Sequence, residues 1–321
     1  MYIFVKNDPM NMLLIAAGLA LLILGGNWLL KAAVSLSLKL EIPKIVIGMT
    51  VVSFATSAPE LIVSLNSALN GHADIALGNV IGSNIANFGF VLGVVIMIGT
   101  IQVQRSFYVH DWPVMMLSSL LLYLFMTTGK EIVRWEGFLM FTLLILFLIY
   151  LIRFQTTAVV DEMPEDDVPL PLGKSMGFLL IGGLALWGGS ELLIEGAVNM
   201  AAHFGISKRI IGITIISVGT SIPELAASVI AVARKEKAIS LGNLIGSNVF
   251  NILAVVGITS MVTPIPVEDE GLLNFDVLWM LYFALLIFVL VFAPSRMKLS
   301  WREGLILAAS YMVFIAILVS K

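Results

Sequence analysis

Glu60 and Glu224 are carboxylates inside long apolar stretches of the chain, and each directly follows a proline. Two groups of side chains share the spacing i, i+3, i+4 and i+7, which places each group on one face of a helix. These groups are Ser53, Thr56, Ser57 and Glu60, and Ser217, Thr220, Ser221 and Glu224. A carboxylate at the middle of a bilayer costs roughly 3 kcal/mol or more, so both glutamates are expected to be functional.

Pro59 and Pro223 predict an interruption in the helices that carry these two stripes. Proline has no backbone N–H and crowds the preceding turn, so each helix should kink or open there. Opening would free carbonyl oxygens near Ser53 and Ser217. A cation could accept such oxygens in place of water.

The apolar stretch after each carboxylate carries another polar stripe, spaced i, i+4 and i+8. These stripes are Asn79, Ser83 and Asn87, and Asn243, Ser247 and Asn251. Four converging stripes would form a cage made only of oxygen ligands. The alternative for a single hydroxyl is a bond to its own i−4 carbonyl, and the alternative for Gly78 and Gly82 is close helix packing.

Hard oxygen ligands without imidazole or thiolate disfavour zinc and copper. A flexible cage of carboxylates, hydroxyls, amides and carbonyls suits Ca²⁺ and, by the same logic, Na⁺, whereas Mg²⁺ prefers a tighter octahedron. Two carboxylates in one low-dielectric site repel each other, so the ionised site is costly when empty. One Ca²⁺, two Na⁺ or two protons would neutralise it, which favours exchange of ions over leakage.

The composition is that of a membrane protein. Of the 321 residues, 59% are hydrophobic and 12% are charged, whereas a soluble chain is about half apolar and a quarter charged. No basic cluster with interleaved aromatics is present, so nucleic acid is not an expected partner. The absence of cysteine excludes disulfides, thiolate metal sites and cysteine nucleophiles.

A membrane-spanning helix needs about 20 apolar residues, and this length predicts an all-α polytopic protein with ten spans. They are 12–38, 44–69, 75–101, 112–128, 136–154, 176–204, 210–233, 238–263, 272–293 and 303–320. A linker with five acids and three prolines, 155–174, separates an N-terminal unit, 1–154, from a C-terminal unit, 175–321. We expect the helices of the second and seventh spans to be broken.

Lysine and arginine are unequally divided between the two sides of this topology. Twelve of the eighteen fall on the side of the linker. They are Lys31, Lys39, Lys44, Arg105, Arg153, Lys174, Arg234, Lys235, Lys237, Arg296, Lys298 and Arg302. Because positive charge concentrates in cytoplasmic loops, we expect the linker inside and both termini outside the cytoplasmic membrane.

An internal repeat is the strongest feature of the chain. "IGMTVVSFATSAPE" (47–60) aligns with "IGITIISVGTSIPE" (211–224), and "LGNVIGSNIAN" (77–87) aligns with "LGNLIGSNVFN" (241–251). Both pairs share one offset of 164 residues, since 47 aligns with 211 and 77 with 241. Five spans per unit is an odd number, so the second copy crosses the membrane in the opposite sense. Inverted repeats with interrupted helices indicate a transporter with its site near the midplane.

These paired blocks resemble the alpha-repeats, 47–87 and 211–251 here, of the sodium/calcium exchanger family within the calcium/cation antiporter superfamily. The resemblance covers both repeats and implies four clustered cation sites between the second, third, seventh and eighth spans. It implies that Glu60 and Glu224 are carboxylates shared by Ca²⁺ and Na⁺, and that the first and sixth spans slide as a gate. The other implied ligands are the hydroxyl or carbonyl oxygens of Thr56, Ser57, Thr220 and Ser221, the carbonyls of Ser53 and Ser217, and the side chains of Ser83, Ser247, Asn87 and Asn251.

Two positions depart from the family pattern. Asn251 stands where some relatives carry aspartate, so the site has one acid fewer, which leaves the coupling stoichiometry and the use of H⁺ or K⁺ open. Ala55 stands where the second repeat has Gly219, and alanine makes the first hinge stiffer than glycine would.

The sequence thus predicts a secondary antiporter that exchanges Na⁺ for Ca²⁺ by alternating access, without a cofactor or an obligate protein partner. An H⁺/Ca²⁺ or K⁺-dependent exchanger on the same scaffold is the nearest alternative, and an ion channel is the next. An intramembrane enzyme is disfavoured, because none of the eight Asp is central to a span and no H-E-x-x-H is present.

Overall fold

The computed structural model describes residues 8–154, 169–203, 219–293 and 297–320, and these are almost entirely helical. Within these ranges, nine helices are long and apolar enough to cross a membrane, and they match nine of the ten predicted spans. The seventh predicted span, 210–233, is described only from Gly219 onward and contains the shorter apolar helix Ile222–Ala233. The predicted all-α polytopic fold is therefore confirmed, with four very short strands added to it.

The predicted linker, 155–174, is only partly covered. Residues 155–168 lie outside the described residues, and the next helix already begins at Leu172. The described N-terminal elements are α1 (Asp8–Leu40), α2 (Lys44–Ile47), η1 (Gly48–Val52), α3 (Ser53–Leu69), α4 (Ala73–Ala86), η2 (Asn87–Leu92), α5 (Gly93–Ile98), β1 (Ile101–Gln102), η3 (Phe107–Asp111), α6 (Trp112–Thr128), β2 (Glu131–Ile132) and α7 (Arg134–Phe154). The C-terminal elements are α8 (Leu172–His203), α11 (Ile222–Ala233), α12 (Lys237–Phe250), η6 (Asn251–Val256), α13 (Gly257–Val262), β3 (Ile265–Pro266), η7 (Leu272–Asp276), α14 (Val277–Phe292), β4 (Lys298–Leu299) and α15 (Trp301–Ser320).

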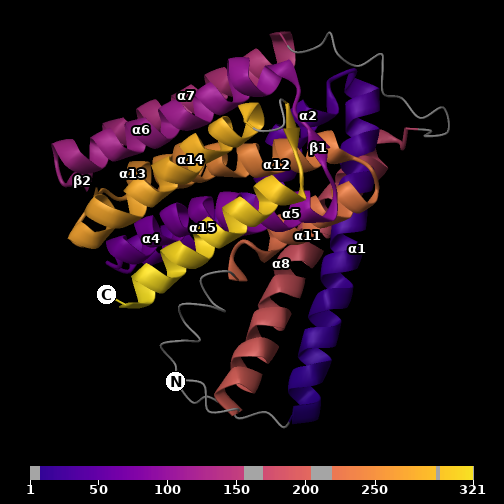
Figure 1. Ribbon diagram of the computed structural model, residues 1–321, viewed down its shortest axis with the longest axis horizontal. Coiled ribbons are helices and arrows are strands. Elements are labelled where there is room, and N and C mark those ends of the chain that lie inside the picture. Colours follow the sequence, from indigo (N-terminus) through magenta and orange to yellow (C-terminus); the bar gives the residue numbers. More distant parts are fainter. Residues whose placement is uncertain (1–7, 155–168, 204–218, 294–296, 321) are drawn as a thin grey trace.

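The helices α1 and α8 lie side by side and cross the remaining helices at a steep angle (Figure 1). Glycines allow their backbones to touch: a Cβ on Gly18 would lie 2.7 Å from the carbonyl oxygen of Gly189, and one on Gly25 would lie 2.8 Å from that of Gly182. These pairs make the two helices antiparallel. Gly18 aligns with Gly182 and Gly25 with Gly189 under the repeat offset, so each contact is the counterpart of the other.

The two halves also exchange their peripheral helices. The N-terminal helix α5 packs on α15 of the C-terminal half, and α13 packs on α7 of the N-terminal half. At both crossings a glycine meets a glycine: a Cβ on Gly93 would lie 3.2 Å from the Gly304 carbonyl oxygen, and one on Gly257 would lie 3.2 Å from that of Gly137. Gly93 and Gly257 are repeat counterparts, whereas Gly137 and Gly304 are separated by 167 residues, so the two contacts are similar but shifted by three residues on the partner helix.

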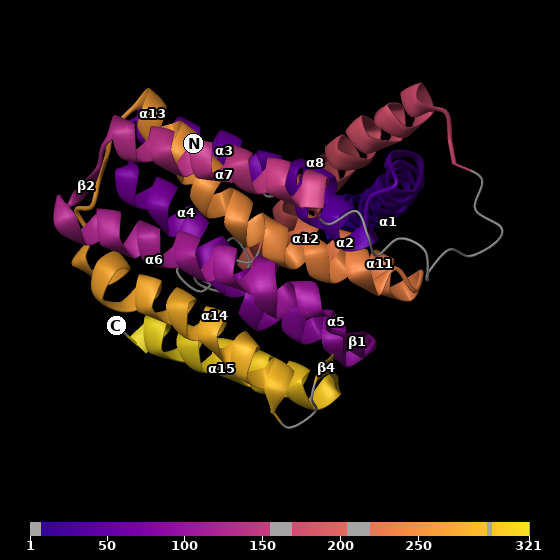
Figure 2. The same cartoon turned by 90° about the horizontal axis from the view of Figure 1, so that it is seen from above.

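Two short antiparallel strand pairs join the halves at opposite ends of the bundle. Strand β1 pairs with β4, and β2 pairs with β3. The repeat counterparts β1 and β3 therefore lie at opposite ends (Figure 2), as an inverted repeat requires. The first pair also places the connections after the third and ninth spans on one side, as the predicted order of ten spans requires.

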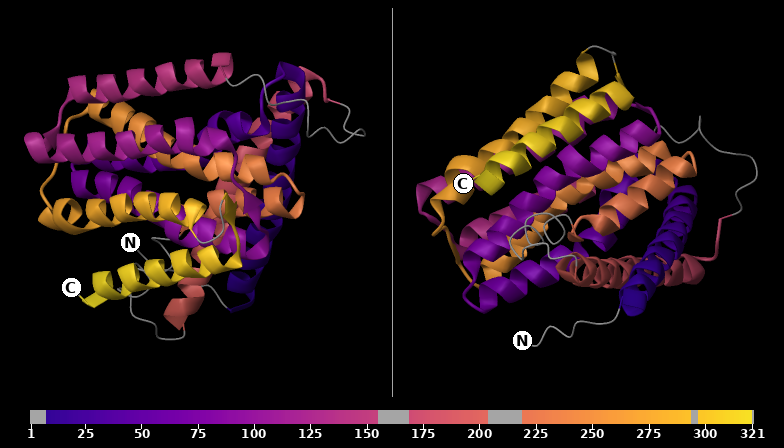
Figure 3. Two further views of the ribbon diagram at one scale, coloured as in Figure 1. Left: turned by 45° about the horizontal axis from the view of Figure 1, so that its top comes forward. Right: turned by 60° about the horizontal axis from the view of Figure 1, so that its bottom comes forward.

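The segments that carry the repeated motifs occupy the centre of the molecule. Within the most apolar part of each span, 83% is buried in Lys237–Val262 and 72% in Ala73–Ile98, whereas only 28% is buried in Trp301–Ser320. The outer helices α6, α7, α14 and α15 cover these central spans (Figure 3). Because of this layering, the motif residues are buried inside the protein, and exposed leucines lie on the outer helices.

Sequence reasoning missed the π-helical segments, of which the described residues contain η1, η2, η3, η6 and η7. Segments η2 and η6 begin at the repeat counterparts Asn87 and Asn251. A π-helical turn inserts one residue into the α-helical ladder and is frequent at functional sites. Both asparagines are candidate ligands, so the π-helical turns that begin at them help to determine where their side chains lie.

Two other buried acids have structural roles. Glu303 accepts hydrogen bonds from the backbone N–H and the hydroxyl of Ser300 at the start of α15, and Glu136 accepts one from the N–H of Val133 before α7. These contacts satisfy free N–H groups at helix starts, as in a capping box. Full or near-full burial of a carboxylate therefore does not by itself mark an ion site in this protein.

Candidate cation-binding site

Glu60 of α3 and Glu224 of α11 lie completely buried in the centre of the bundle. The elements around them are α3, α4, α11 and α12, which contact one another. The hydroxyl of Ser57, three residues before Glu60 on α3, donates to Oε1 of Glu224, so both carboxylates belong to one centre. No lysine or arginine is buried in the part of the chain that the structure describes. The negative charge of the pair is therefore not balanced by a neighbouring side chain.

The chain opens at Pro223, as predicted. Helix α11 begins at Ile222 with Pro223 in its first turn, and Ser221 precedes it with φ −90° and ψ 4°. This start places Glu224 in the first turn of the helix. Its Oε1 accepts a hydrogen bond of 3.4 Å from the hydroxyl of Ser57, while its Oε2 and the buried Ser221 hydroxyl have no described partner.

The second span differs from the seventh at the corresponding proline. Helix α3 runs unbroken from Ser53 to Leu69 with Pro59 inside it, so the chain does not open at Pro59. Its departure from α-helical geometry lies upstream, in η1. The missing N–H of Pro59 is accommodated within the continuing helix. Both carboxylate oxygens of Glu60 lie beyond it without a described hydrogen-bond partner.

Hydroxyl groups link the two halves in two matching pairs. The Thr56 and Ser247 hydroxyl oxygens are 3.3 Å apart, and so are those of Ser83 and Thr220. Thr56 aligns with Thr220 and Ser83 with Ser247, so one contact is again built twice. The convergence of four stripes that the sequence predicts is thus present for these residues.

A second layer of amides supports the stripes. Asn79 donates to the hydroxyl of Ser64 over 3.0 Å, and Asn243 donates to that of Ser228 over 3.1 Å. Ser64 and Ser228 were not among the predicted site residues. The signal was available, because Ser64 continues the stripe four residues after Glu60 and Ser228 does the same after Glu224.

Of the two serines that were predicted to offer a carbonyl oxygen to a cation, the structure describes one. The Ser53 hydroxyl donates to the carbonyl oxygens of Gly48, at 2.8 Å, and Asn243, at 2.9 Å, and so ties η1 to α12. Its own carbonyl oxygen lies 3.4 Å from the Thr56 hydroxyl. Ser217 lies outside the described residues.

Asn87 and Asn251 are fully buried, as ligands facing an enclosed site must be. The Asn251 amide donates to Oδ1 of Asn84 over 3.1 Å, which leaves its own Oδ1 without a described partner. Neither polar atom of the Asn87 side chain has one. Asn84 is a further residue that the predicted stripes did not include.

The unpartnered buried atoms share one chemistry. Six of them are oxygens of Glu60, Glu224, Ser221, Asn87 and Asn251, and a buried polar atom without a partner costs about 1–3 kcal/mol. The described residues contain no group of three or more His, Cys, Asp or Glu that could hold a metal ion. Two carboxylates surrounded by neutral oxygens are instead a set suited to a hard cation such as Ca²⁺ or Na⁺.

The glycines of α12 and α4 differ in the contacts that the described residues make with them. A Cβ on Gly246 would lie 2.6 Å from Cα of Met49, so α12 is pressed against η1. A Cβ on the counterpart Gly82 would meet no described atom within 4 Å, and one on Gly78 would meet only Leu272 at 3.8 Å. Close helix packing, expected for Gly78 and Gly82, is seen at the counterpart Gly246, whereas Ile213, the counterpart of Met49, lies outside the described residues. A cavity of about 370 Å³, lined by Asn79 and Thr220 among others, borders the open side.

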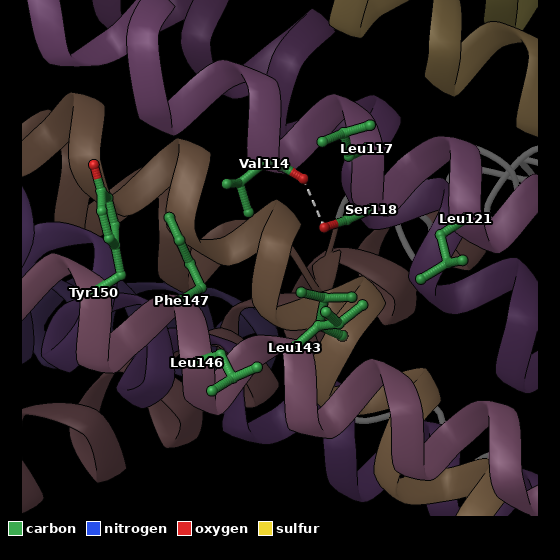
Figure 4. Close-up of a pocket in the computed structure, with 9 residues that line it drawn as sticks. Val114, Leu117, Ser118, Leu121, Leu143, Leu146, Phe147 and Tyr150 are labelled. Carbon is green, nitrogen blue, oxygen red and sulfur yellow. Dashed lines mark hydrogen bonds between the residues drawn. The ribbon is translucent and has the colours of Figure 1, made fainter.

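A second cavity, of about 480 Å³, lies between α6 and α7 and is built differently (Figure 4). Leucines, Val114 and Phe147 form most of its wall, and its Ser118 hydroxyl is already bonded to the carbonyl of Val114 at 2.7 Å. No carboxylate lines it. This cavity cannot coordinate a cation.

Comparison with known proteins gives matches over most of the chain. The sequence model of the family described as sodium/calcium exchanger protein matches residues 10–153 and 174–320. The chain is similar to inner membrane protein YrbG of Escherichia coli (30% identity, covering 95% of each chain) and to sodium/calcium exchanger MaX1 of Methanosarcina acetivorans (26% identity, covering 96% of this chain and 98% of the other). The structure of the sodium/calcium exchanger from Methanococcus jannaschii superimposes with a TM-score of 0.81 at 27% identity, covering 96% of this chain and 98% of that one.

Proposed function

Because this chain belongs to the sodium/calcium exchanger protein family, we propose that it exchanges Na⁺ for Ca²⁺ across the cytoplasmic membrane. The family consists of exchangers rather than enzymes, and the chain is a multi-pass membrane protein. The observation that carries the proposal is the central pair Glu60 and Glu224, fully buried and without a buried lysine or arginine among the described residues. Such a pair needs cations to neutralise it.

We assign both carboxylates to the transported ions as shared ligands. The neutral ligands are proposed to be the hydroxyl or carbonyl oxygens of Thr56, Ser57, Thr220 and Ser221, the side chains of Ser83, Ser247, Asn87 and Asn251, and the carbonyls of Ser53 and Ser217. The paired hydroxyls across the two halves support this set, because a cation between them replaces weak contacts of 3.3 Å with coordination. Asn79 and Asn243 act as supports that hold the stripes, since their amides already bond Ser64 and Ser228.

We propose that this exchange proceeds by alternating access. The cavity lined by Thr220 and the close contact of Gly246 with Met49, both among the described residues, support this proposal. A site that is costly when empty favours the exchange of one Ca²⁺ for Na⁺ over passage without a counter-ion. The positive-inside bias predicts that the linker side is cytoplasmic and both termini are outside, and similarity to an inner membrane protein supports the membrane assignment.

A flux measurement tests the exchange. Proteoliposomes loaded with Na⁺ are diluted into Na⁺-free K⁺ or choline medium, and uptake of radioactive Ca²⁺ is followed with and without an imposed pH gradient. Uptake that requires internal Na⁺ is expected. Uptake driven only by the pH gradient would assign the protein to H⁺/Ca²⁺ exchange, a requirement for K⁺ to K⁺-dependent exchange, and uptake without any counter-ion gradient to a channel.

Asn251→Asp is expected to change the Na⁺ or pH dependence of exchange more than its maximal rate. The substitution adds a third carboxylate and removes the amide N–H that Asn84 accepts. A shift of about tenfold in apparent Na⁺ affinity corresponds to about 1.4 kcal/mol. Asn87→Asp is the matched variant, because it adds the same charge at the counterpart position without breaking a described hydrogen bond. An unaltered ion dependence in both would make these positions structural only.

A further inference from the structure

The elements α2, β1 and α11 come together at one end of the bundle (Figure 2). Residues of α2, β1 and the turn between α11 and α12 line a basic cavity of about 790 Å³ there. It is separate from the carboxylate pair. Four of its lining residues are cationic, namely Lys44, Arg234, Lys235 and Lys237, and one, Glu236, is acidic. The one carboxylate among these described residues balances one of the four positive charges, so three remain unbalanced.

The contacts of these cations hold them around the cavity. Lys44 forms an ion pair of 2.9 Å with Glu236, and both side chains are only 13% exposed. Arg234 donates to Oδ1 of Asn27 at 2.9 Å, and Lys237 donates to the carbonyl oxygen of Thr100 at 2.7 Å. Neutral acceptors fix these two groups in place without cancelling their charge.

Lys235 is the least constrained member of the cluster. Its backbone is left-handed, with φ 65°, and its ammonium has no described hydrogen-bond or ion-pair partner. A left-handed conformation is unfavourable for a lysine, where asparagine or glycine would be relaxed. The turn therefore keeps a positive side chain at a position better suited to other residues.

Helix α12 adds a favourable field for anions. It begins at Lys237, and its first-turn residue Ala238 lines the cavity. Free N–H groups and the helix dipole make such a helix start attractive to phosphate. The amides of Gln102 and Gln104, on the opposite wall, can donate further hydrogen bonds.

The corresponding place in the other repeat keeps only one of these four cations, because Lys44 aligns with Lys208 but the other three align with uncharged residues. Asn70, Gly71 and Ala73 align with Arg234, Lys235 and Lys237, and Glu268 aligns with Gln104. There Asp74 accepts hydrogen bonds from the backbone N–H groups of Glu268 and Asp269. The positive-inside rule explains basic residues on one side of the membrane but not their arrangement around a cavity.

We propose that this cavity binds a phosphate-bearing anion, supplied by the headgroup of an anionic lipid or by free phosphate or polyphosphate. The anion joins Lys44, at the start of the N-terminal half's second span, to the turn that precedes α12 of the C-terminal half. It thereby stabilises the contact between η1 and α12 at Gly246. This site is independent of the proposed cation exchange.

Thermal unfolding of the full-length protein in neutral detergent tests the proposal at fixed ionic strength. The probes are inorganic phosphate, pyrophosphate and short-chain phosphatidylglycerol, with chloride and short-chain phosphatidylcholine as references. Either phosphate or phosphatidylglycerol is expected to raise the unfolding temperature above its reference, because a ligand of the folded state stabilises it. A response to phosphatidylglycerol alone identifies a lipid headgroup, and a response to the inorganic anions identifies a soluble ligand.

The double variant Lys235→Asn/Lys237→Gln is expected to weaken apparent anion affinity by about tenfold or more, because charge-assisted hydrogen bonds to phosphate are lost. Asparagine tolerates the left-handed turn. Lys39→Gln/Arg302→Gln, two exposed cations outside the cavity, is the charge-matched control and should retain the affinity. If the double variant does not fold, Lys235→Asn alone serves. No response above the references, or equal affinity in variant and control, would overturn the proposal, and neither result depends on Ca²⁺ flux.

Discussion

Replacing Glu224 or Glu60 by glutamine is expected to abolish Na⁺-dependent Ca²⁺ uptake while leaving the protein folded. Each substitution removes one of the two buried negative charges that face the ion, in a centre without a buried lysine or arginine in the described ranges. Removing one partner from a buried contact between a cation and a carboxylate costs about 3–5 kcal/mol, which corresponds to a loss of ion affinity of roughly 10²–10³-fold. The amide oxygen of glutamine can still accept the Ser57 hydroxyl at position 224, so packing should be retained.

Radioactive Ca²⁺ uptake into Na⁺-loaded proteoliposomes measures the effect, with thermal unfolding as the check on folding. Glu303→Gln is a matched control, because Glu303 is also fully buried but contacts Ser300 at a helix start. It should lower stability without changing the dependence of uptake on Na⁺. Normal exchange in either central variant would show that the shared-carboxylate site is wrongly assigned.

The motif residues could be predicted because repetition and helical spacing act together. The offset of 164 residues aligns Thr56 with Thr220 and Ser83 with Ser247. In the structure the hydroxyl of Thr56 contacts that of Ser247, and the hydroxyl of Ser83 contacts that of Thr220, so both contacts join the two halves. A single stripe in a membrane helix is weak evidence, since hydroxyls often bond their own backbone. When two polar stripes occur in each of two inverted repeats, the simplest arrangement that buries all four is one shared centre between the repeats.

Other features depend on tertiary packing and give no periodic signal. The π-helical segments shift the helix register by one residue, and the motif pattern is the same with or without that shift. Pro59 and Pro223 stand at aligned positions, yet the chain opens at Pro223, where Gly219 precedes it, and remains helical at Pro59, where Ala55 stands at the corresponding place. Sequence equivalence therefore predicts which residues correspond but not which conformation each half adopts.

This difference between the halves has a consequence for two glycines. Gly246→Ala is expected to lower the unfolding temperature, because its Cβ would lie 2.6 Å from both Cα and the carbonyl oxygen of Met49. A backbone contact cannot be relieved by a change of rotamer, and overpacking of this kind costs about 1–3 kcal/mol. Gly82→Ala is the matched variant. Its Cβ meets no described atom within 4 Å, and alanine favours a helix over glycine by about 1 kcal/mol, so its unfolding temperature should be equal to or above that of the parent.

Exchange should respond differently from stability. An exchanger with inverted repeats reaches its second conformation when the two halves exchange roles, so the close contact now made at Gly246 would form at Gly82. Gly82→Ala should therefore slow Na⁺-dependent Ca²⁺ uptake by about tenfold or more, although its Cβ meets no described atom within 4 Å. Flux at the parent rate in a fully folded Gly82→Ala protein would mean that the packing seen on α12 is not transferred to α4. The transport cycle would then depend on movements other than an exchange of roles between the halves, and the glycine contacts between α1 and α8 would be the next place to look for them.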